Sequence, residues 1–198
     1  MHYLNAETHM SDAPQRILVK EVNWLGDIVM SQPALRAVRA AYPLAYLAVL
    51  VQREFASFFD GATWVDDVLP YRVRPGWRGI GDQGRLIGDL RRRRFDLAIL
   101  LPDSFQSALW CASAGIPNRI GYVRDARGPL LTRGIARTAT TLQGHQVHYR
   151  LHLLRAALGI EGNADAFAID IAPQPRTRML AWLEERRQRP NGLLIGLA

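Results

Sequence analysis

A short apolar run, a glycine–aspartate pair and an amphipathic pattern follow one another between Arg16 and Tyr42, in the sequence RILVKEVNWLGDIVMSQPALRAVRAAY. The run at residues 17–19 is long enough for a buried strand. Gly26 tolerates the backbone angles of a tight turn, and apolar residues then recur from Ile28 onward at the spacing of a helix. This order predicts a strand, a turn and a helix, which is the repeating unit of an α/β domain.

Asp27 stands where the predicted helix begins, and two roles fit it equally well. In an open α/β sheet, ligands bind beyond the carboxyl ends of the strands, where a carboxylate can act as a general base on a substrate hydroxyl. Aspartate is also a frequent N-cap, because it accepts hydrogen bonds from unpaired backbone amides. Pro33 adds a constraint, since an interior proline clashes with the carbonyl four residues earlier. We expect a kink, or a separate first turn with Ser31 capping the main helix.

One further segment indicates the kind of sheet. Residues 95–101, FDLAILL, form a continuous apolar run, which indicates burial on both faces, as in a parallel sheet. The pattern therefore predicts a Rossmann-like α/β domain, with a mostly parallel sheet and helices on both faces. The other expected strands are 46–51, 65–71, 118–122, 166–171 and 193–197, and the expected helices include 54–59, 85–94, 145–158 and 173–187.

Residues 72–84, RVRPGWRGIGDQG, are rich in glycine and arginine. Residues 79–84 match the dinucleotide fingerprint G-x-G-x-x-G, but that motif needs a turn directly after the first strand. We therefore expect no nicotinamide or flavin site here. We expect instead a mobile loop that presents Arg72, Arg74 and Arg78 to an anion.

The net charge of +7 depends almost wholly on arginine, since Lys20 is the sole lysine. Between Arg72 and Arg94, eight arginines stand against two aspartates. The planar guanidinium suits bidentate binding of phosphate and carboxylate. An acidic partner is therefore expected, which leaves nucleic acid, an anionic lipid surface and an anionic sugar as classes.

The length of 198 residues suits one domain, or one domain and the beginning of another. We expect a flexible leader at 1–14, a domain at 15–190 and the start of a second domain at 191–198.

Cys111 is the single cysteine, and its apolar neighbours indicate a buried thiol. No apolar run approaches the roughly eighteen residues of a membrane span. The histidines at 145, 148 and 152 share a predicted helix face, but no carboxylate or cysteine nearby completes a metal set.

Two blocks of sequence give the chain a family resemblance. They are NWLGD at 23–27 with MSQPALR at 30–36, and LPDSFQSAL at 101–109 with AGIP at 114–117 and RIGY at 119–122. Both resemble the lipopolysaccharide heptosyltransferases of glycosyltransferase family 9, and the heptosyltransferase II group most closely. The likeness covers only the amino-terminal half of such an enzyme. It implies the acceptor-binding domain of a two-domain GT-B glycosyltransferase, followed by a nucleotide-sugar-binding domain.

The resemblance implies transfer of heptose from ADP-heptose to the Kdo-lipid A inner core of lipopolysaccharide, with inversion of the anomeric carbon and Asp27 as general base. It implies a cytoplasmic enzyme, peripheral on the anionic inner-membrane surface, with no metal or other cofactor and no nucleic-acid partner. The amino-terminal half alone is expected to be inactive. Resemblance and charge together give the expected acceptor-binding residues, which are Trp24, Gly26, Gln32, Arg72, Arg74, Ser104, Arg119, Arg124 and His145.

Two other functions stay open. A Gly-Asp corner is shared widely in the family, so a related glycosyltransferase with another donor or acceptor fits as well. Charge alone favours a noncatalytic domain that binds anions or nucleic acid. Against that class, no recognition helix or aromatic stacking platform stands among the basic residues.

Overall fold

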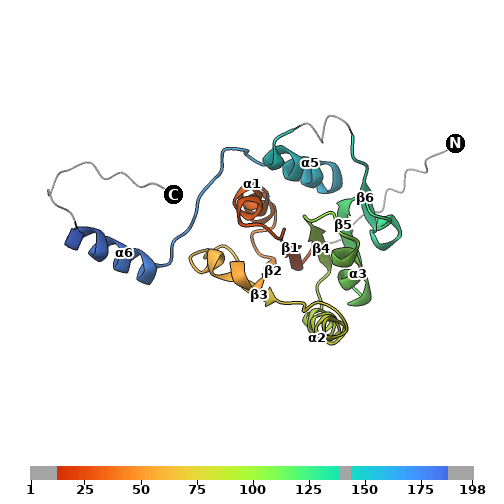
Figure 1. Cartoon of the computed structure of the whole chain (residues 1–198). Helices are drawn as coiled ribbons and strands as arrows, with labels where there is room; N and C mark the ends of the chain where they lie inside the picture. Colours follow the sequence, from red (N-terminus) through yellow and green to blue (C-terminus); the bar gives the residue numbers. More distant parts are fainter. Residues whose placement is uncertain (1–12, 139–143, 187–198) are drawn as a thin grey trace.

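The computed structural model describes residues 13–138 and 144–186, and its centre is a parallel sheet covered by helices (Figure 1). The six strands are all parallel and lie in the order β3-β2-β1-β4-β5-β6. This is the strand order of a doubly wound Rossmann domain, so the predicted fold class is confirmed. The strands are β1 (Arg16–Lys20), β2 (Tyr46–Gln52), β3 (Asp67–Tyr71), β4 (Leu97–Leu100), β5 (Asn118–Tyr122) and β6 (Arg133–Ile135).

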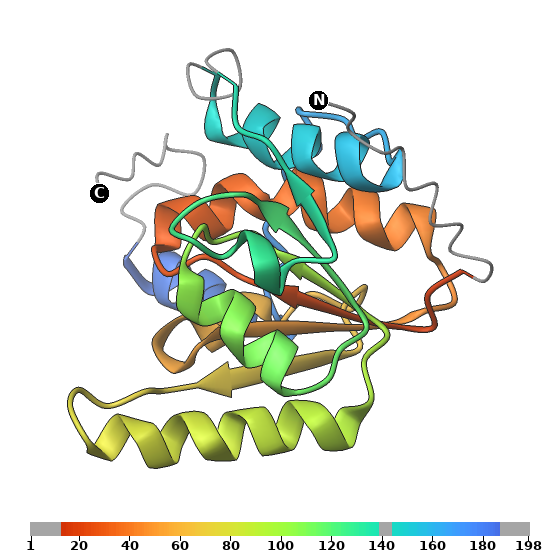
Figure 2. The same ribbon diagram turned by 90° about the vertical axis from the view of Figure 1, so that its right-hand side faces the viewer.

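Helices cover both faces of the sheet, and each face has its own apolar core (Figure 2). The helices are α1 (Leu25–Ala41), α2 (Arg78–Arg93), α3 (Phe105–Ser113), α5 (Gln146–Leu158) and α6 (Pro173–Arg186), with 3-10 turns η1 (Arg53–Phe59) and η2 (Gly128–Leu130). On one face α1 packs against α5, and on the other α2 packs against α3. Every residue of β4 is buried, as its apolar run predicts. None of the described residues of α6 is buried, and this helix lies apart from the sheet in Figure 1.

The strand order reverses between β1 and β4, and this reversal positions the candidate site. Where neighbouring strands lead away in opposite directions, a crevice opens beyond their carboxyl ends. The chain leaves β1, β3 and β4 at this edge and enters α1, α2 and α3 directly, so all three helices begin here. Their first turns surround the crevice.

The glycine-rich loop is shorter than predicted, because α2 already begins at Arg78. The carboxylate of Asp82 accepts hydrogen bonds from the backbone amide of Arg74 (3.1 Å) and from its Nε and Nη2 (2.8 Å each). Gly79 is buried against the carbonyl of Arg74, in a space that a side chain would overfill. The prediction of a mobile loop is therefore wrong for residues 78–84, where these contacts outweigh the low helix propensity of glycine.

The predicted strand at 166–171 is also wrong, since these residues pair with no strand of the described sheet. The segment is held against α1 and the loop before β3. Arg36 donates to the carbonyl of Ala168 (3.1 Å) and to the carboxylate of Asp170 (2.7 Å), which also accepts from the indole of Trp64 (2.7 Å). Conversely, β6 is missing from the prediction, because three residues carry too little pattern to identify a strand.

The helix α1 differs from the prediction at its start, and at its proline it excludes the predicted separate first turn. Gly26 has no left-handed backbone angle and lies inside the first helical turn, not in a tight turn before it. Pro33 neither ends nor divides the helix, which runs through it to Ala41. Ser31 does not cap a separate helix. Its hydroxyl lies 2.7 Å from the carbonyl of Ile28, one turn earlier, and so adds a bond beside the ladder that the proline interrupts.

Some predictions lie outside the described residues. These are the leader, of which only Ala13 and Pro14 are described, and the beginning of a second domain at 191–198. Cys111 is buried, as predicted. In the described part of the chain, no helix is both long and apolar enough to cross a membrane.

Candidate active site at the carboxyl edge of the sheet

Asp27 lies in the first turn of α1, at the crevice. Its Oδ1 accepts a hydrogen bond from Nη2 of Arg150 at 2.9 Å, and its side chain is 31% exposed. Trp24 occupies the N-cap position, and no side chain of the described residues caps this helix. The N-cap interpretation of Asp27 is therefore wrong, which leaves its carboxylate available to a ligand.

Arg150 holds that carboxylate from the neighbouring helix α5. Its side chain is 4% exposed, and its Nη1 donates to the carbonyl of Gln146 at 3.1 Å. Its Nε is buried and has no hydrogen-bond partner among the described residues. An enclosed guanidinium of this kind fixes the position of Asp27. Within residues 13–138 and 144–186, no donor contacts the second carboxylate oxygen, Oδ2.

Glu21 extends this group of charges into the interior, under α1. It is fully buried, with Oε2 accepting from the amide of Val22 at 2.8 Å and Oε1 lying 2.6 Å from the hydroxyl of Ser31. That hydroxyl has one proton to donate and also lies 2.7 Å from the carbonyl of Ile28. Burial raises the pKa of Glu21 to about 7, although the hydrogen bond that Ser31 donates to its carboxylate lowers that pKa in part.

Lys20 precedes Glu21 and therefore points to the opposite face of the sheet. It is 1% exposed. Its Nζ donates to the carbonyl of Glu21 and to Oδ1 of Asn23 (3.3 Å), and it lies 4.7 Å from the centre of the Tyr71 ring. Burial lowers the pKa of Lys20 from 10.5 to about 7. The end of the central strand thus carries two buried ionisable groups, one on each face.

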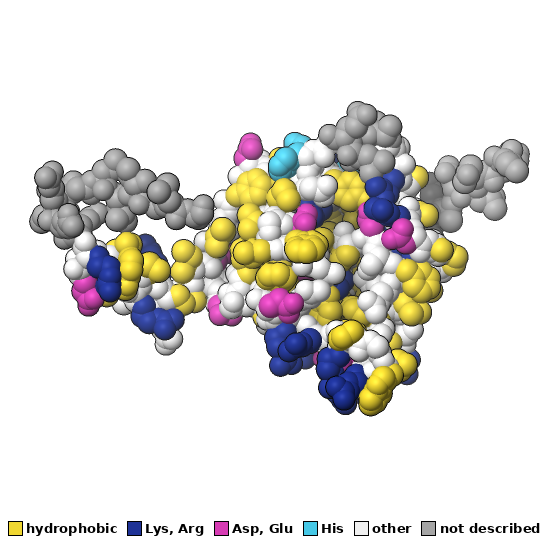
Figure 3. All heavy atoms as spheres, viewed as in Figure 1, with side chains coloured by type: hydrophobic (Ala, Val, Ile, Leu, Met, Phe, Trp, Pro, Cys, Tyr) yellow, Lys and Arg dark blue, Asp and Glu magenta, His cyan; other side chains and the backbone are white. Residues whose placement is uncertain are grey.

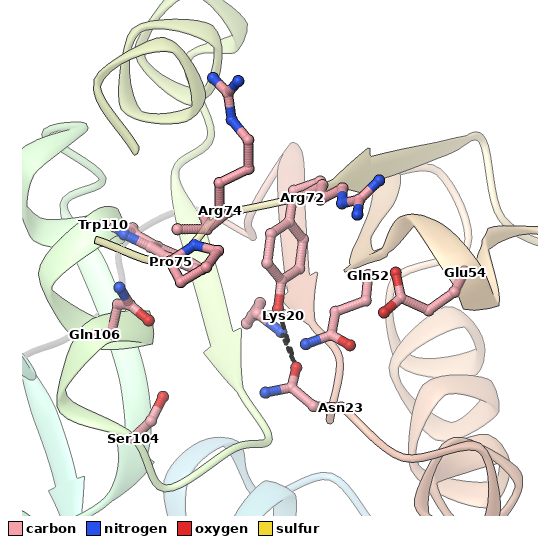
Figure 4. Close-up of a pocket in the computed structure, with 12 residues that line it drawn as sticks. Lys20, Asn23, Gln52, Glu54, Arg72, Arg74, Pro75, Ser104, Gln106 and Trp110 are labelled. Atoms are coloured by element: carbon pink, nitrogen blue, oxygen red, sulfur yellow. Dashed lines mark hydrogen bonds between the residues drawn. The ribbon is translucent and has the colours of Figure 1, made fainter. Parts of the chain in front are cut away.

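An open pocket of about 450 Å³ adjoins Lys20 (Figure 4). Its wall comes from the carboxyl ends of β1, β2 and β3 and from the first turns of α3. The hydroxyl of Tyr71 donates to Asn23 at 2.9 Å within the pocket. Arg72 and Arg74 lie above Lys20 in Figure 4, and Ser104 lies on the side of α3. A volume of this order accommodates a small polar ligand.

A second charged group surrounds Asp103, beyond the end of β4. The hydroxyl of Tyr149 donates to its Oδ2 at 2.9 Å. Guanidinium nitrogens of Arg127 and Arg137 lie 3.4 Å from the carboxylate, and one of Arg124 lies 3.9 Å from it. Three cations around one carboxylate leave positive charge at this edge. Figure 3 shows a second group of arginines on the same face of the molecule, near α2.

Most of the predicted site residues come together at this edge. Trp24, Gly26 and Asp27 lie at the start of α1, and Trp24 is 75% exposed. Arg72, Arg74 and Ser104 line the pocket, Arg124 lies beside Asp103, and His145 is the N-cap residue of α5.

Ser104 and His145 also cap the helices that they precede. The hydroxyl of Ser104 caps α3 by accepting from the amide of Ser107 at 3.3 Å. A ring nitrogen of His145 accepts from the amide of Val147 at 3.4 Å. In the described residues, no three histidine, cysteine or acidic side chains gather as a metal site would require.

Two predicted residues lie away from the crevice. Gln32 is 2% exposed, and its amide donates to the carbonyl of Ile28 at 3.2 Å, so it supports α1 from the interior. Arg119 lies near the amino end of β5, at the opposite edge of the sheet, where its guanidinium donates to the carbonyls of Leu130 (2.6 Å) and Ile116. Charge alone indicated Arg119, and the direction of its strand overrides that indication.

Sequence reasoning did not select Lys20, Glu21 or Arg150. One signal for Lys20 was present, since a single lysine among so many arginines stands at the end of a buried strand. No comparable local signal distinguishes Arg150, because its contact with Asp27 joins residues 123 positions apart.

Comparisons with known proteins identify the family and the fold of the chain. The model of glycosyltransferase family 9 (heptosyltransferase) matches residues 83–191, more than half of the chain. Lipopolysaccharide heptosyltransferase 2 of Escherichia coli K12 is 36% identical over 116 residues, which are 59% of this chain and 33% of that protein. The chain therefore matches about a third of the length of this relative.

Two solved structures have the same fold. The structure of E. coli ADP-heptose lipopolysaccharide heptosyltransferase II superposes with a TM-score of 0.66 and 26% identity, covering 85% of this chain and 50% of that one. A family 9 glycosyltransferase from Veillonella parvula gives a TM-score of 0.80 at 16% identity, covering 93% of this chain and 54% of that one. The predicted likeness to GT-B enzymes is thus confirmed, and the chain belongs to glycosyltransferase family 9, the heptosyltransferase family.

Proposed function

We propose that this protein is an inverting glycosyltransferase that transfers heptose from ADP-heptose to the inner core of lipopolysaccharide, with Asp27 as the general base. The family and the names of the relatives support the donor and the acceptor class. One observation carries the role of Asp27: its carboxylate lies at the crevice, held by Arg150 through one oxygen and not engaged in capping α1.

The arrangement suits a single displacement. The acceptor hydroxyl oxygen forms a bond to the anomeric carbon while the bond from that carbon to the diphosphate oxygen breaks, and ADP leaves with the electron pair. Asp27 takes the hydroxyl proton on Oδ2, the oxygen without a donor among the described residues. Attack on the face opposite the leaving group inverts the anomeric carbon. This scheme requires no metal.

We place the acceptor in the pocket at the same edge of the sheet as Asp27, which is not itself among the residues that line the pocket. The inner core of lipopolysaccharide carries carboxylates and phosphates, and the pocket contains Arg72, Arg74 and Lys20. Arg74 is already paired with Asp82, whereas Arg72 forms no ion pair with the described residues. We therefore assign Arg72 the most direct contact with the acceptor, and Ser104 and Arg124 the adjoining ones.

The lipid anchor of the acceptor requires the enzyme to work at a membrane surface. Trp77 and Ile80, at the start of α2, are 78% and 72% exposed, and Arg78 and Arg85 lie in the same part of that helix. Exposed aromatic and apolar side chains among cations favour an anionic lipid surface. These residues support a cytoplasmic enzyme that is peripheral on the inner membrane.

The test is ADP release by the full-length protein with ADP-heptose and a heptosylated inner-core acceptor. Loss of a general base lowers turnover by about a hundredfold or more, so we expect this loss in Asp27→Asn. The matched control is Asp89→Asn, which removes a carboxylate paired with Arg92 and Arg93 on the surface of α2. Full turnover by a folded Asp27→Asn protein would contradict the role of Asp27. Release of another nucleotide in preference to ADP, in competition between nucleotide sugars, would replace the donor.

A further inference from the structure

Lys20 differs from the other cations of the site in its partners. Its amine is buried at the end of β1 and contacts a backbone carbonyl, the amide oxygen of Asn23 and the ring of Tyr71, all uncharged. The ion pairs of the described residues are made by arginines, and none of them includes Lys20. A buried cation without an anionic partner is unfavourable, and its amine gains most from any anion that reaches it.

We propose that Lys20 binds an anionic oxygen group of the acceptor at the floor of the pocket and takes up a proton from solution as this group binds. The inference deepens the proposed function and rests on it, because the proposed acceptor supplies the carboxylate or phosphate. Lys20 would then be a ligand-binding residue whose charge depends on whether the site is occupied.

The pocket gives an anion access to this amine. Lys20 is among the residues that line the pocket, and Figure 4 shows it in the middle, between Asn23 below and Arg72 above. An anion seated there would reach the amine of Lys20, in a pocket that Arg72 also lines. Binding would also exclude water, which strengthens this attraction.

The other ionisable groups around Lys20 leave room for such a counter-charge. Burial raises the pKa of the Cys111 thiol and of the Tyr71 hydroxyl to about 12, so both are neutral at physiological pH. Glu21 lies on the opposite face, bonded to Val22 and Ser31, and burial lowers the pKa of Lys20 more than the charge of Glu21 raises it. The charged groups that share the pocket are Glu54 from η1 and Arg72 and Arg74 after β3.

A lysine can couple binding to protonation here, whereas an arginine cannot. Burial lowers the pKa of Lys20 to about 7, so the amine is largely neutral above that pH when the pocket is empty. A bound anion favours the ammonium form and raises the pKa. Binding above neutrality therefore consumes a proton, and affinity falls as the pH rises, by at most about tenfold per pH unit. Arginine stays charged throughout this range.

Isothermal titration calorimetry of the full-length protein tests this coupling. The probe is a deacylated, heptosylated inner-core oligosaccharide, titrated at about pH 8.5 in buffers with different ionisation enthalpies. We expect uptake of close to one proton per oligosaccharide bound. Lys20→Arg should bind without proton uptake, and Lys20→Met should bind more weakly and also without uptake. Arg92→Gln, on the exposed surface of α2, is the control and should retain both.

The outcomes separate this inference from the proposed function. Proton uptake that is absent in the wild type, or unchanged in a folded Lys20→Met protein, would overturn the role of Lys20 even if ADP release were normal. Inorganic sulfate, which does not titrate in this range, provides a second probe. Sulfate binding with uptake of a proton that Lys20→Met abolishes would support the role of Lys20, even if the oligosaccharide did not bind and the proposed acceptor were wrong. Circular dichroism confirms folding, and if Lys20→Arg is too large to fold, Lys20→Met alone decides.

Discussion

At the end of β1, the two faces of the sheet differ in whether their charged side chains are paired. On the face of α1 and α5, Asp27 is paired with a buried Arg150, and Glu21 lies beneath them with both oxygens bonded. On the other face, Lys20 and Arg72 line an open pocket and form no ion pair with the described residues. On the first face the charges of Asp27 and Arg150 are paired, and this pair holds one carboxylate in place. The second has unbalanced positive charge, as a site for an anionic ligand requires.

Removing Arg150 from the face with paired charges should have the largest effect on the stability of the protein. Arg150→Gln removes the cation that fixes Asp27 and that also stabilises ionised Glu21. Breaking a buried ion pair costs about 3–5 kcal/mol. Because the Asp27 side chain is 31% exposed, water compensates part of this loss, and we expect a cost of about 2 kcal/mol in the free energy of unfolding. Urea denaturation measures this cost.

A double-mutant cycle sharpens the same comparison. If Arg150 acts through Asp27, then Arg150→Gln should lower turnover by about tenfold or more in the wild type and have little further effect in Asp27→Asn. Additive losses of turnover would show that Arg150 acts independently of Asp27. Arg155→Gln is a matched control, since Arg155 lies on the same helix and pairs with Glu161 at the surface.

The free energy of unfolding should depend on pH through one buried group on each face of the sheet, Glu21 and Lys20. Glu21 has its pKa raised from 4.5 to about 7, so between these values the folded state binds more protons than the unfolded state and stability falls as pH rises. Lys20 has its pKa lowered from 10.5 to about 7, so above 7 the unfolded state binds more protons and stability rises with pH. Together the two groups predict a minimum of stability near pH 7.

In a plot of the free energy of unfolding against pH, the acid arm below pH 7 should depend on Glu21 and the alkaline arm above pH 7 on Lys20. The slope of each arm is at most about 1.4 kcal/mol per pH unit, the value for one proton. Denaturation at a series of pH values should lose the acid arm in Glu21→Gln and the alkaline arm in Lys20→Met. A curve whose alkaline arm survives in Lys20→Met would mean that the amine of Lys20 is charged in the folded protein at neutral pH.

The sequence predicted the framework better than the site, for a physical reason. Buried strands such as the one within residues 95–101 can be recognised from their own sequence, because their apolar runs reflect burial on both faces. The role of Asp27 depended on its neighbours in space: only the structure places Trp24 at the N-cap and Arg150 against the carboxylate. The prediction of a loop at residues 78–84 was wrong because Asp82 and Gly79 contact Arg74 and stabilise the first turns of α2. The glycine content of this segment does not reveal these contacts.

Ser104 offers a smaller test on the side of the pocket formed by α3. Its hydroxyl caps α3 and also lines the pocket. Ser104→Ala should lower the free energy of unfolding by about 1 kcal/mol, the usual cost of losing a cap. If the hydroxyl only caps, acceptor KM should follow the wild type after the loss of stability is considered. Ser104→Asp, which retains capping but adds a negative charge, should raise KM if Ser104 faces an anionic acceptor.

Substitution of Arg72 should have the smallest effect on stability. This substitution tests most directly whether the unpaired positive charge of the pocket binds the acceptor. Arg72→Gln removes an exposed guanidinium with no ion pair among the described residues, so the free energy of unfolding should change by less than about 0.5 kcal/mol. Acceptor KM should nevertheless rise by about threefold to tenfold, since a charge-assisted hydrogen bond contributes roughly 1 kcal/mol or more to binding. Arg92→Gln, at another exposed position, in α2, should leave KM unchanged. Equal effects of the two substitutions, both abolished by salt, would mean that net charge attracts the acceptor and that the pocket does not position it.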